Sequence, residues 1–394
     1  MRNAFGAGLG VILLVGLYYA ITIPSSDVGS APSNEPITIG FIGPLTGDAA
    51  EYNIPIKNAV FLAVKDLKAQ GKNIEVVYED GGCDGDMAAR ALNKLVAIDK
   101  VKVVIGGACN GETLAMAPVA EREHVVLFSP SASSPDVTGA GQFVFRNVPS
   151  DTATSEALAR LAHATHSSVA ILSEAVDSTH DARTGFGTAF SGDGGDVVFD
   201  EAFAPDERDF KGLIKRIRES GAEAVMLNPQ TESLAGAFMK QFRKSGATST
   251  VYGMSVLGGG AFLDAAGEAA DGIVFADYVP LDAANPQAQA FLEDYRKFFG
   301  EPKRDFAIAS AYDAVNLIVQ AAGHVGYDGP RIRDYLYNLP QYDGLAGKYS
   351  FDLNGDVVGA LIGFKAVNKG AVERYTPCYK FDVLESKNVP EAPC

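Results

Sequence analysis

Two strand-to-helix turns of similar chemistry follow one another between Val103 and Thr138. Each turn follows an apolar run that predicts a buried strand, and each consists largely of small and hydroxyl-bearing residues, Gly106–Thr113 in the first and Ser129–Ser134 in the second. In a parallel sheet such turns lie at the carboxyl ends of the strands, where backbone N–H groups at helix starts bind small anions. We therefore expect a binding pocket for a small carboxylate here. Ser, Asn and Gly are also ordinary turn and helix-cap residues, which explains either turn alone as well.

Strand and helix patterns alternate along most of the chain, which predicts α/β architecture with parallel, doubly wound sheets. The first series starts with an apolar strand at Ile37–Ile42. An extended segment, Gln142–Asp151, then resembles a crossing to a second series of the same kind. After Asp277 the pattern becomes strongly helical, as a return to the first domain requires. The alternating tail from Tyr349 onward, with Asn354-Gly355 between its apolar runs, predicts an antiparallel hairpin.

Composition limits the classes of partner. The chain has 394 residues, of which 47% are hydrophobic and 21% charged, so it can form two domains with proper cores. Its formal net charge is −16. Because binding to phosphates needs a surface rich in Lys and Arg, we expect no nucleic-acid partner.

The N-terminus predicts export. Residues Phe5–Ile23 form an uncharged, largely apolar run after Arg2, long enough to span a bilayer as a helix. Small-residue sites occur at Tyr18–Ala20 and Val28–Ala31, but the run is longer than a usual signal-peptide core, so residues 1–24 form either a cleaved signal peptide or an uncleaved membrane anchor. Residues 25–36 are rich in Ser, Pro and Asn and predict a flexible linker.

Export makes the four cysteines candidates for disulfides, and four cysteines allow three pairings. Cys83 and Cys109 each follow a predicted strand, so they share one sheet edge if those strands lie side by side. We then expect Cys83 to pair with Cys109, and Cys378 with Cys394.

Metal and catalytic chemistry find little support. The spacing of Asp84 and Asp86 is explained by a helix cap, and the residues around Asn354 lack the closing Glu of a calcium loop. His180 has no serine in a nucleophile turn to act on. We therefore expect no metal, no cofactor and no enzymatic activity.

Eight segments together resemble the type I periplasmic binding proteins, within them the leucine/isoleucine/valine-binding receptors of ABC transporters, over Ile37 to about Val367. They are IGFIGPLTGDAAEYN, YEDGGCD, VVIGGACNGET, VVLFSPSASSPDVT, RDFKGLIKRIRESGAEAV, GEAADGIVF, AYDAV and GLAGKYSFDLNGD. The resemblance implies two lobes joined by three crossing strands that close on a ligand. It places lobe 1 at residues 37–148 plus 279–340, and lobe 2 at 149–278 plus 341–394.

The resemblance also assigns ligand-binding positions in the first lobe. Tyr52 matches a residue that packs against the ligand, and Asn110 stands where the family commonly has Ser. Ala132 and Ser133 match positions that contact the ligand's carboxylate and amine. These residues suit an α-carboxylate.

The second lobe departs from the family pattern. Ser178 falls near the position of a family Tyr, and Thr231 or Glu232 near that of another aromatic residue. Ser255 occupies the position of the acid that binds the ligand's ammonium group. If the ligand is an amino acid, Glu232 or Asp177 must supply that charge.

The implied function is capture of an amino acid of the branched-chain type, or a related small carboxylate, outside the inner membrane for an ABC permease. Two alternatives stay open. One is a ligand sensor tethered to the membrane through residues 5–23, and the other is a receptor for an amine-free carboxylate or amide.

Overall fold

The structure is a computed structural model that describes residues 36–47, 49–176, 179–278, 281, 285–302, 305–359, 362–375, 379–382 and 387–390. The chain divides into two compact units, Met1–Glu35 and Pro36–Cys394, and both large sheets belong to the second. The predicted signal or anchor, Asp177, Ser178, Cys378 and Cys394 all lie outside the described residues.

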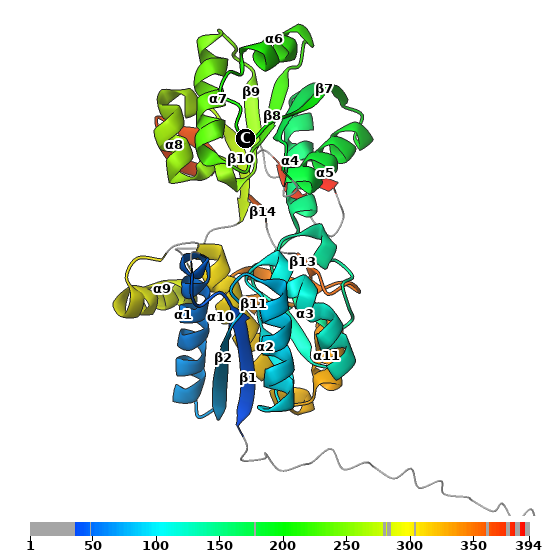
Figure 1. The fold of residues 1–394 in the computed structure, drawn as a ribbon, viewed down its shortest axis with the longest axis vertical. Coiled ribbons are helices and arrows are strands. Elements are labelled where there is room, and N and C mark those ends of the chain that lie inside the picture. Colours follow the sequence, from blue (N-terminus) through cyan, green and yellow to red (C-terminus); the bar gives the residue numbers. More distant parts are fainter. Residues whose placement is uncertain are drawn as a thin grey trace, which may run out of the picture. The chain divides into compact units, whose positions relative to one another are not determined.

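The first sheet is fully parallel and has five strands in the order β2-β1-β3-β4-β5. Figure 1 shows β1 and β2 side by side in it. Its strands are β1 (Ile37–Gly43), β2 (Ile74–Asp80), β3 (Val103–Ile105), β4 (Val126–Ser129) and β5 (Val144–Arg146). The helices packed with it are α1 (Ala50–Ala69), α2 (Gly85–Ala97), α3 (Asn110–Glu123), α9 (Pro286–Phe299), α10 (Asp305–Val325) and α11 (Gly329–Tyr337). This order reverses direction at β1, as a doubly wound sheet does.

The second sheet has seven strands in the order β15-β14-β10-β9-β8-β6-β7. The strands β6 (Ser168–Glu174), β7 (Asp196–Phe203), β8 (Ala224–Asn228), β9 (Thr250–Gly253) and β10 (Val274–Tyr278) are parallel. β14 (Ile362–Asn368) and β15 (Ala371–Tyr375) add an antiparallel edge. The associated helices are α4 (Asp151–His163), α5 (His180–Gly192), α6 (Lys211–Glu219), α7 (Glu232–Lys244) and α8 (Gly260–Ala266). A two-stranded sheet, β16 (Tyr379–Asp382) and β17 (Lys387–Pro390), follows.

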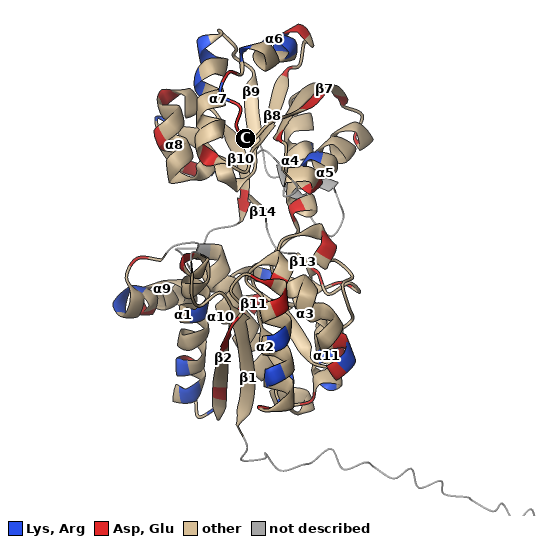
Figure 2. Ribbon diagram, viewed as in Figure 1, with Lys and Arg blue, Asp and Glu red and all other residues tan. Residues whose placement is uncertain are grey.

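Buried residues alternate between the two faces of the second sheet. Val225 and Leu227 belong to one core cluster, whereas Ala224 and Met226 belong to the other. Because successive side chains of a strand point to opposite faces, both faces of this sheet are covered. Charge also distinguishes the strands from the helices that cover them: in Figure 2, β1, β8 and β9 carry no charged residue, whereas the helices do.

The core of the first sheet contains residues 39–148 and 281–357, and the second sheet's two clusters lie between residues 157 and 367. The described chain therefore passes between the cores three times, after Val148, after Ala276 and after Val357. These passages agree with the predicted crossings.

The third passage comes later than expected. Sequence analysis assigned residues from 341 onward to the second lobe, but Leu345, Tyr349, Phe351 and Val357 are buried in the first core. They belong to the small sheet formed by β11 (Tyr342–Gly344), β12 (Gly347–Phe351) and β13 (Val357–Val358). The ring of Phe351 packs edge-on against Phe128 at 5.6 Å, which holds this sheet on the first core.

The predicted hairpin turn is confirmed. β12 pairs with β13 in antiparallel register, Phe351 opposite Val357. Gly355 has a φ of 78°, and the Asp352 carboxylate accepts hydrogen bonds from the amides of Asn354 and Asp356 at 2.8 and 3.0 Å. The carboxylate therefore serves the turn itself.

One helix among the described residues is long and apolar enough to cross a membrane, the segment Phe306–Val325 of α10. The apolar 18-residue stretch of this segment is 72% buried inside the protein, and the helix packs beside α1 in the first core (Figure 1).

Candidate functional site

A cavity of about 630 Å³ opens where strands of both sheets end. It is lined by Tyr52, Pro130, Ser131, Ser133, Val148, Asp151, Gln230, Ser255, Asp277, Tyr278, Phe306, Ala307 and Lys365. A side cavity of about 110 Å³ shares five of these residues and extends to others that include Thr154, Thr179 and Asn228. This location is the one where open α/β sheets bind their ligands.

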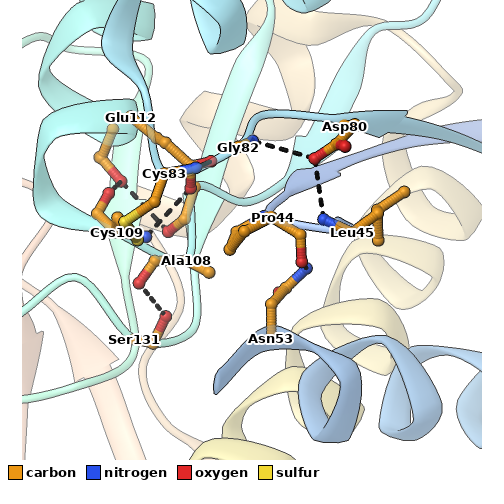
Figure 3. Close-up of a disulfide and its surroundings, with 12 residues drawn as sticks. Pro44, Leu45, Asn53, Asp80, Gly82, Cys83, Ala108, Cys109, Glu112 and Ser131 are labelled. Atoms are coloured by element: carbon orange, nitrogen blue, oxygen red, sulfur yellow. Dashed lines mark hydrogen bonds between the residues drawn. A yellow bond between two sulfur atoms is a disulfide. The ribbon is translucent and has the colours of Figure 1, made fainter. Parts of the chain in front are cut away.

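The serine turn after β4, Ser129–Ser134, forms one wall. Its first residue, the buried Ser129, donates a hydrogen bond to the Gly107 carbonyl at 2.9 Å and accepts one from the Ala132 amide at 2.9 Å. Ser131 donates to the Ala108 carbonyl at 3.0 Å (Figure 3). The two turns identified in the sequence are therefore bonded to each other.

A disulfide joins Cys83 to Cys109, as predicted (Figure 3). The premise of that prediction was wrong, because β1 lies between β2 and β3 and the two strands are not neighbours. The bridge instead links the loops that follow them. The buried Glu112 carboxylate accepts the amide hydrogens of both cysteines at 3.0 Å, and burial raises the pKa of Glu112. The disulfide and the Glu112 carboxylate therefore both fix the first turn, Gly106–Thr113, to the loop after β2.

Asp151, the first residue of α4, presents a carboxylate to the cavity. It accepts a hydrogen bond from the Ser133 hydroxyl at 3.1 Å, while its own amide donates to the Ser133 carbonyl at 2.9 Å. Burial raises the pKa of Asp151 to about 6, although Ser133 and Arg146 act in the opposite direction. A carboxyl group that titrates near neutral pH inside a cavity is typical of a functional site.

Arg146, 1% exposed, connects the serine turn to the hairpin after β12. One guanidinium nitrogen, Nη1, donates to the carbonyls of Ala132 and Ser134 at 3.2 and 2.7 Å. Nε and Nη2 donate to the Asp356 carboxylate at 2.6 and 3.0 Å, and Nη2 also donates to Thr138 at 2.6 Å. A bidentate buried pair of this kind fixes geometry as well as charge.

Aromatic rings form a further wall. Tyr278 at the end of β10 stacks on Phe306 at the start of α10, with ring centroids 4.4 Å apart. Burial raises the pKa of Tyr278, so its hydroxyl stays protonated. Tyr52 in the first turn of α1 also lines the cavity.

An ion pair connects the neighbouring strands β10 and β14 in the cavity wall. Lys365 Nζ lies 2.6 Å from Asp277 Oδ2, and both residues line the cavity. The Asp277 carboxylate also accepts the Tyr278 amide hydrogen at 2.8 Å.

The structure brings three of the predicted ligand-binding residues, Tyr52, Ser133 and Ser255, to the cavity wall. Two other predicted first-lobe residues support the turn without lining the cavity. Asn110 accepts a hydrogen bond from the Ser134 amide at 3.1 Å, and the buried Ala132 bonds to Ser129 and Arg146.

Of the two predicted second-lobe acids, Glu232 lies elsewhere and Asp177 is outside the described residues. The Glu232 carboxylate accepts the amide hydrogens of Ala261 and Phe262 at 2.9 and 3.2 Å, at the start of α8, and is not among the lining residues. Thr231 donates to the Glu174 carboxylate at 2.8 Å. Glu232 therefore satisfies N–H groups that a helix start leaves unpaired, and Thr231 connects the loop after β8 to the end of β6.

Sequence reasoning missed three charged lining residues, Asp151, Asp277 and Lys365. The acids had a detectable signal, since each stands at the end of a segment that the sequence marks as a crossing between domains. Lys365 had none, because it lies within an alternating strand like any surface lysine.

Comparisons with known proteins identify the family. The sequence profile for "periplasmic binding protein" matches residues 36–371. The leucine-, isoleucine-, valine-, threonine- and alanine-binding protein of Pseudomonas aeruginosa is 24% identical over 328 residues, covering 82% of this chain and 87% of that protein.

Two solved structures are similar over most of the chain. The branched-chain amino acid transporter substrate-binding protein of Streptococcus pneumoniae, in complex with isoleucine, is 27% identical with a TM-score of 0.69, covering 86% of this chain and 98% of its own. A solute-binding protein of an ABC transporter from Rhodopseudomonas palustris, in complex with 3,4-dihydroxybenzoic acid, is 25% identical with a TM-score of 0.70, covering 88% and 97%. The chain therefore belongs to the periplasmic binding protein family, as its sequence motifs predict, and shares the fold of the branched-chain amino acid-binding proteins.

Proposed function

We propose that the protein is the extracytoplasmic solute-binding protein of an ABC transporter, which captures an amino acid or a related small carboxylate and delivers it to a permease in the inner membrane. One observation supports this above all: the serine turn and Asp151 face the same cavity and are bonded to each other. Neutral donors and an acid placed side by side suit a zwitterion.

The serine turn suits the ligand's carboxylate. The amide N–H of Ser133 has no hydrogen-bond partner in the described part of the chain, and the hydroxyls of Ser131 and Ser133 lie beside it. A carboxylate accepts such donors in charge-assisted hydrogen bonds. Asp151 suits the ammonium group, because a buried ammonium without a partner would cost several kcal/mol.

Binding by closure of the two lobes fits this arrangement. The cavity takes its lining from segments that follow strands of both sheets, Ser131 after β4 and Ser255 after β9 among them, so a bound solute contacts both sides. Hinge closure around a ligand is a common motion of such proteins. The relatives named above are binding proteins, which supports binding rather than catalysis.

A second candidate is an amine-free aromatic carboxylate. The rings of Tyr52, Tyr278 and Phe306 favour it, since they offer faces for stacking a benzoate ring. The relative from Rhodopseudomonas palustris was solved with such a ligand. Asp151 opposes it, because an ionised acid repels a carboxylate that has no ammonium group beside it.

We further propose that the protein acts outside the inner membrane, in agreement with its family and with the Cys83–Cys109 disulfide, which persists in oxidising compartments. Whether residues 5–23 are cleaved or remain as a tether stays a prediction. N-terminal sequencing of the exported protein distinguishes the two outcomes.

Calorimetry tests the ligand class. We expect leucine and isoleucine or another amino acid to bind, and the Asp151→Asn variant to lose about tenfold or more of that affinity. Binding of the matching keto acid should not weaken in this variant. Asp136→Asn is the matched control, because Asp136 is exposed in the loop after the serine turn. If no amino acid, keto acid or hydroxybenzoate binds the folded protein, the proposed function is refuted.

A further inference from the structure

The ion pair at the β10–β14 edge is not used by the α-carboxylate and ammonium sites described above. Asp277 faces Gly363 across the strands and Phe275 faces Lys365, so the two charged residues are diagonal neighbours on the antiparallel pair. Their side chains are 23% and 28% exposed, and both line the cavity. Lys365 Nζ has one hydrogen-bond partner among the described residues, Asp277, and therefore retains donor capacity.

Charge decides what this pair can receive. An anionic group beside Lys365 would also lie beside the Asp277 carboxylate, 2.6 Å from the ammonium, and a cationic group beside Asp277 would meet Lys365. An aliphatic side chain would shield both charged groups from water without forming a hydrogen bond to either of them. A primary carboxamide has no net charge, a carbonyl that accepts from Lys365 and an NH₂ that donates to Asp277.

The neighbouring lining residues are polar as well. Gln230 and Ser255 line the main cavity together with Asp277, and the side cavity continues to Thr154, Thr179 and Asn228. A pocket for a purely aliphatic side chain is expected to be lined mainly by hydrophobic residues. This part of the cavity is instead mixed, with Met254 and Val256 beside the polar side chains. The hydroxyls of Thr154 and Thr179 and the amide of Asn228 already donate within the protein, so these three side chains offer a ligand acceptor oxygens.

We propose that the solute carries a neutral carboxamide that bridges Asp277 and Lys365, as the side chains of glutamine and asparagine would. The inference rests on the proposed function, since it assumes that the serine turn and Asp151 hold the α-carboxylate and ammonium of the same molecule. It selects the amide amino acids over leucine and over the acidic amino acids.

Calorimetry on the exported chain with five ligands tests this selection. Asparagine, leucine and aspartate have nearly the same shape and differ in the group presented to the pair, while glutamine and glutamate repeat the comparison with one more methylene. We expect the tighter-binding amide, asparagine or glutamine, to bind about tenfold to a hundredfold more tightly than leucine and than the corresponding acid, aspartate or glutamate. This ratio is the free energy that hydrogen bonds to charged groups typically contribute.

The double variant Asp277→Asn/Lys365→Met removes both charges and keeps the net charge. It should bring the affinities for the amide and for leucine to within about threefold of each other. The matched control is Asp343→Asn/Lys348→Met, which removes an exposed Lys–Asp pair with a 3.0 Å separation on β11 and β12 and should leave the preference unchanged. Retention of the amide preference in the Asp277/Lys365 variant would overturn the role of this pair.

A measurement on the unaltered protein is an independent test, because it does not depend on whether a variant folds. Glutamine methylated twice on its amide nitrogen keeps the acceptor and loses the donors to Asp277, so its affinity should fall by at least about tenfold. Leucine binding as tightly as both amides would refute the carboxamide site and leave the proposed function standing. Absence of binding by every amino acid, keto acid and hydroxybenzoate would refute both.

Discussion

The affinity for an amino acid should rise as the pH increases from 5 to 7, because Asp151 must be ionised to pair with the ligand's ammonium group. Burial raises the pKa of Asp151 from 3.8 to about 6, so a large part of the carboxyl group is protonated in mild acid. The groups that act on its charge are Ser133, Arg146 and Asp181, and Asp151 in turn raises the pKa of Tyr278. Ser133 and Arg146 favour the ionised form, but burial outweighs them.

The size of the effect follows from the titration. With a pKa of about 6, roughly one carboxyl in eleven is ionised at pH 5 and roughly ten in eleven at pH 7. If the ligand binds only the ionised form, affinity changes by about tenfold over this interval, or about 1.4 kcal/mol. A nearby ammonium stabilises the carboxylate and lowers its pKa, so binding should release a proton near pH 6.

An amine-free carboxylate reverses the sign. Its anion favours the protonated form of Asp151, so binding should take up a proton and the affinity should fall as the pH rises. Calorimetry in two buffers of different ionisation enthalpy, at steps from pH 5 to 8, measures the number of protons directly. The Asp151→Asn variant should bind with no proton exchange in this range, whereas Asp136→Asn should behave like the unaltered protein. Equal proton exchange with and without Asp151 would show that another group carries the linkage.

Three further predictions concern the frame around the cavity. Replacing Cys83 and Cys109 with serine should lower the free energy of unfolding by about 3 kcal/mol in the chain-entropy model, measured by urea denaturation, and should weaken ligand binding; unchanged affinity would separate the bridge from the site. Arg146→Lys cannot reproduce the bidentate bond to Asp356 and should cost about 2 to 4 kcal/mol of unfolding free energy, whereas Lys should be tolerated if that bond is unimportant. Burial raises the pKa of Asp313 to about 7, above its unfolded value of 3.8, so its contribution to stability is complete below pH 3.8 and is lost as the pH rises to 7. In denaturation curves measured over this range, Asp313→Asn should reduce the fall of the unfolding free energy with pH. An unchanged pH dependence would contradict this assignment.

Local patterns were enough to predict much of this fold. The turn at Asn354-Gly355 could be found because its geometry depends on neighbouring residues alone: a glycine with positive φ and an Asp that binds the next amides. The two turns at Gly106–Thr113 and Ser129–Ser134 could be found for the same reason. Resemblance to a family then supplied the arrangement of the lobes, which periodicity cannot give.

Features that depend on contacts between distant segments were harder to predict. The chain's third crossing was placed near residue 341, since nothing local shows that Phe351 packs on Phe128. Glu232 looked like a free acid near the ligand, but the helix start at Ala261 takes its carboxylate. Asp151 was overlooked as a site residue because an acid in the first turn of a helix is usually explained by the helix itself.

The charges around the cavity together restrict the net charge of the solute. Asp277 and Lys365 cancel each other, and Asp151 is the one lining carboxylate without an ion pair among the described residues. A zwitterion with a neutral side chain matches this balance, because its ammonium meets Asp151 and its carboxylate meets neutral donors. The chain as a whole carries a net charge of −16, which repels anions once they come within about 8–10 Å of its surface, the screening length in physiological salt. A net-neutral solute meets no such barrier, so charge on both scales favours an uncharged amino acid over a free carboxylate anion.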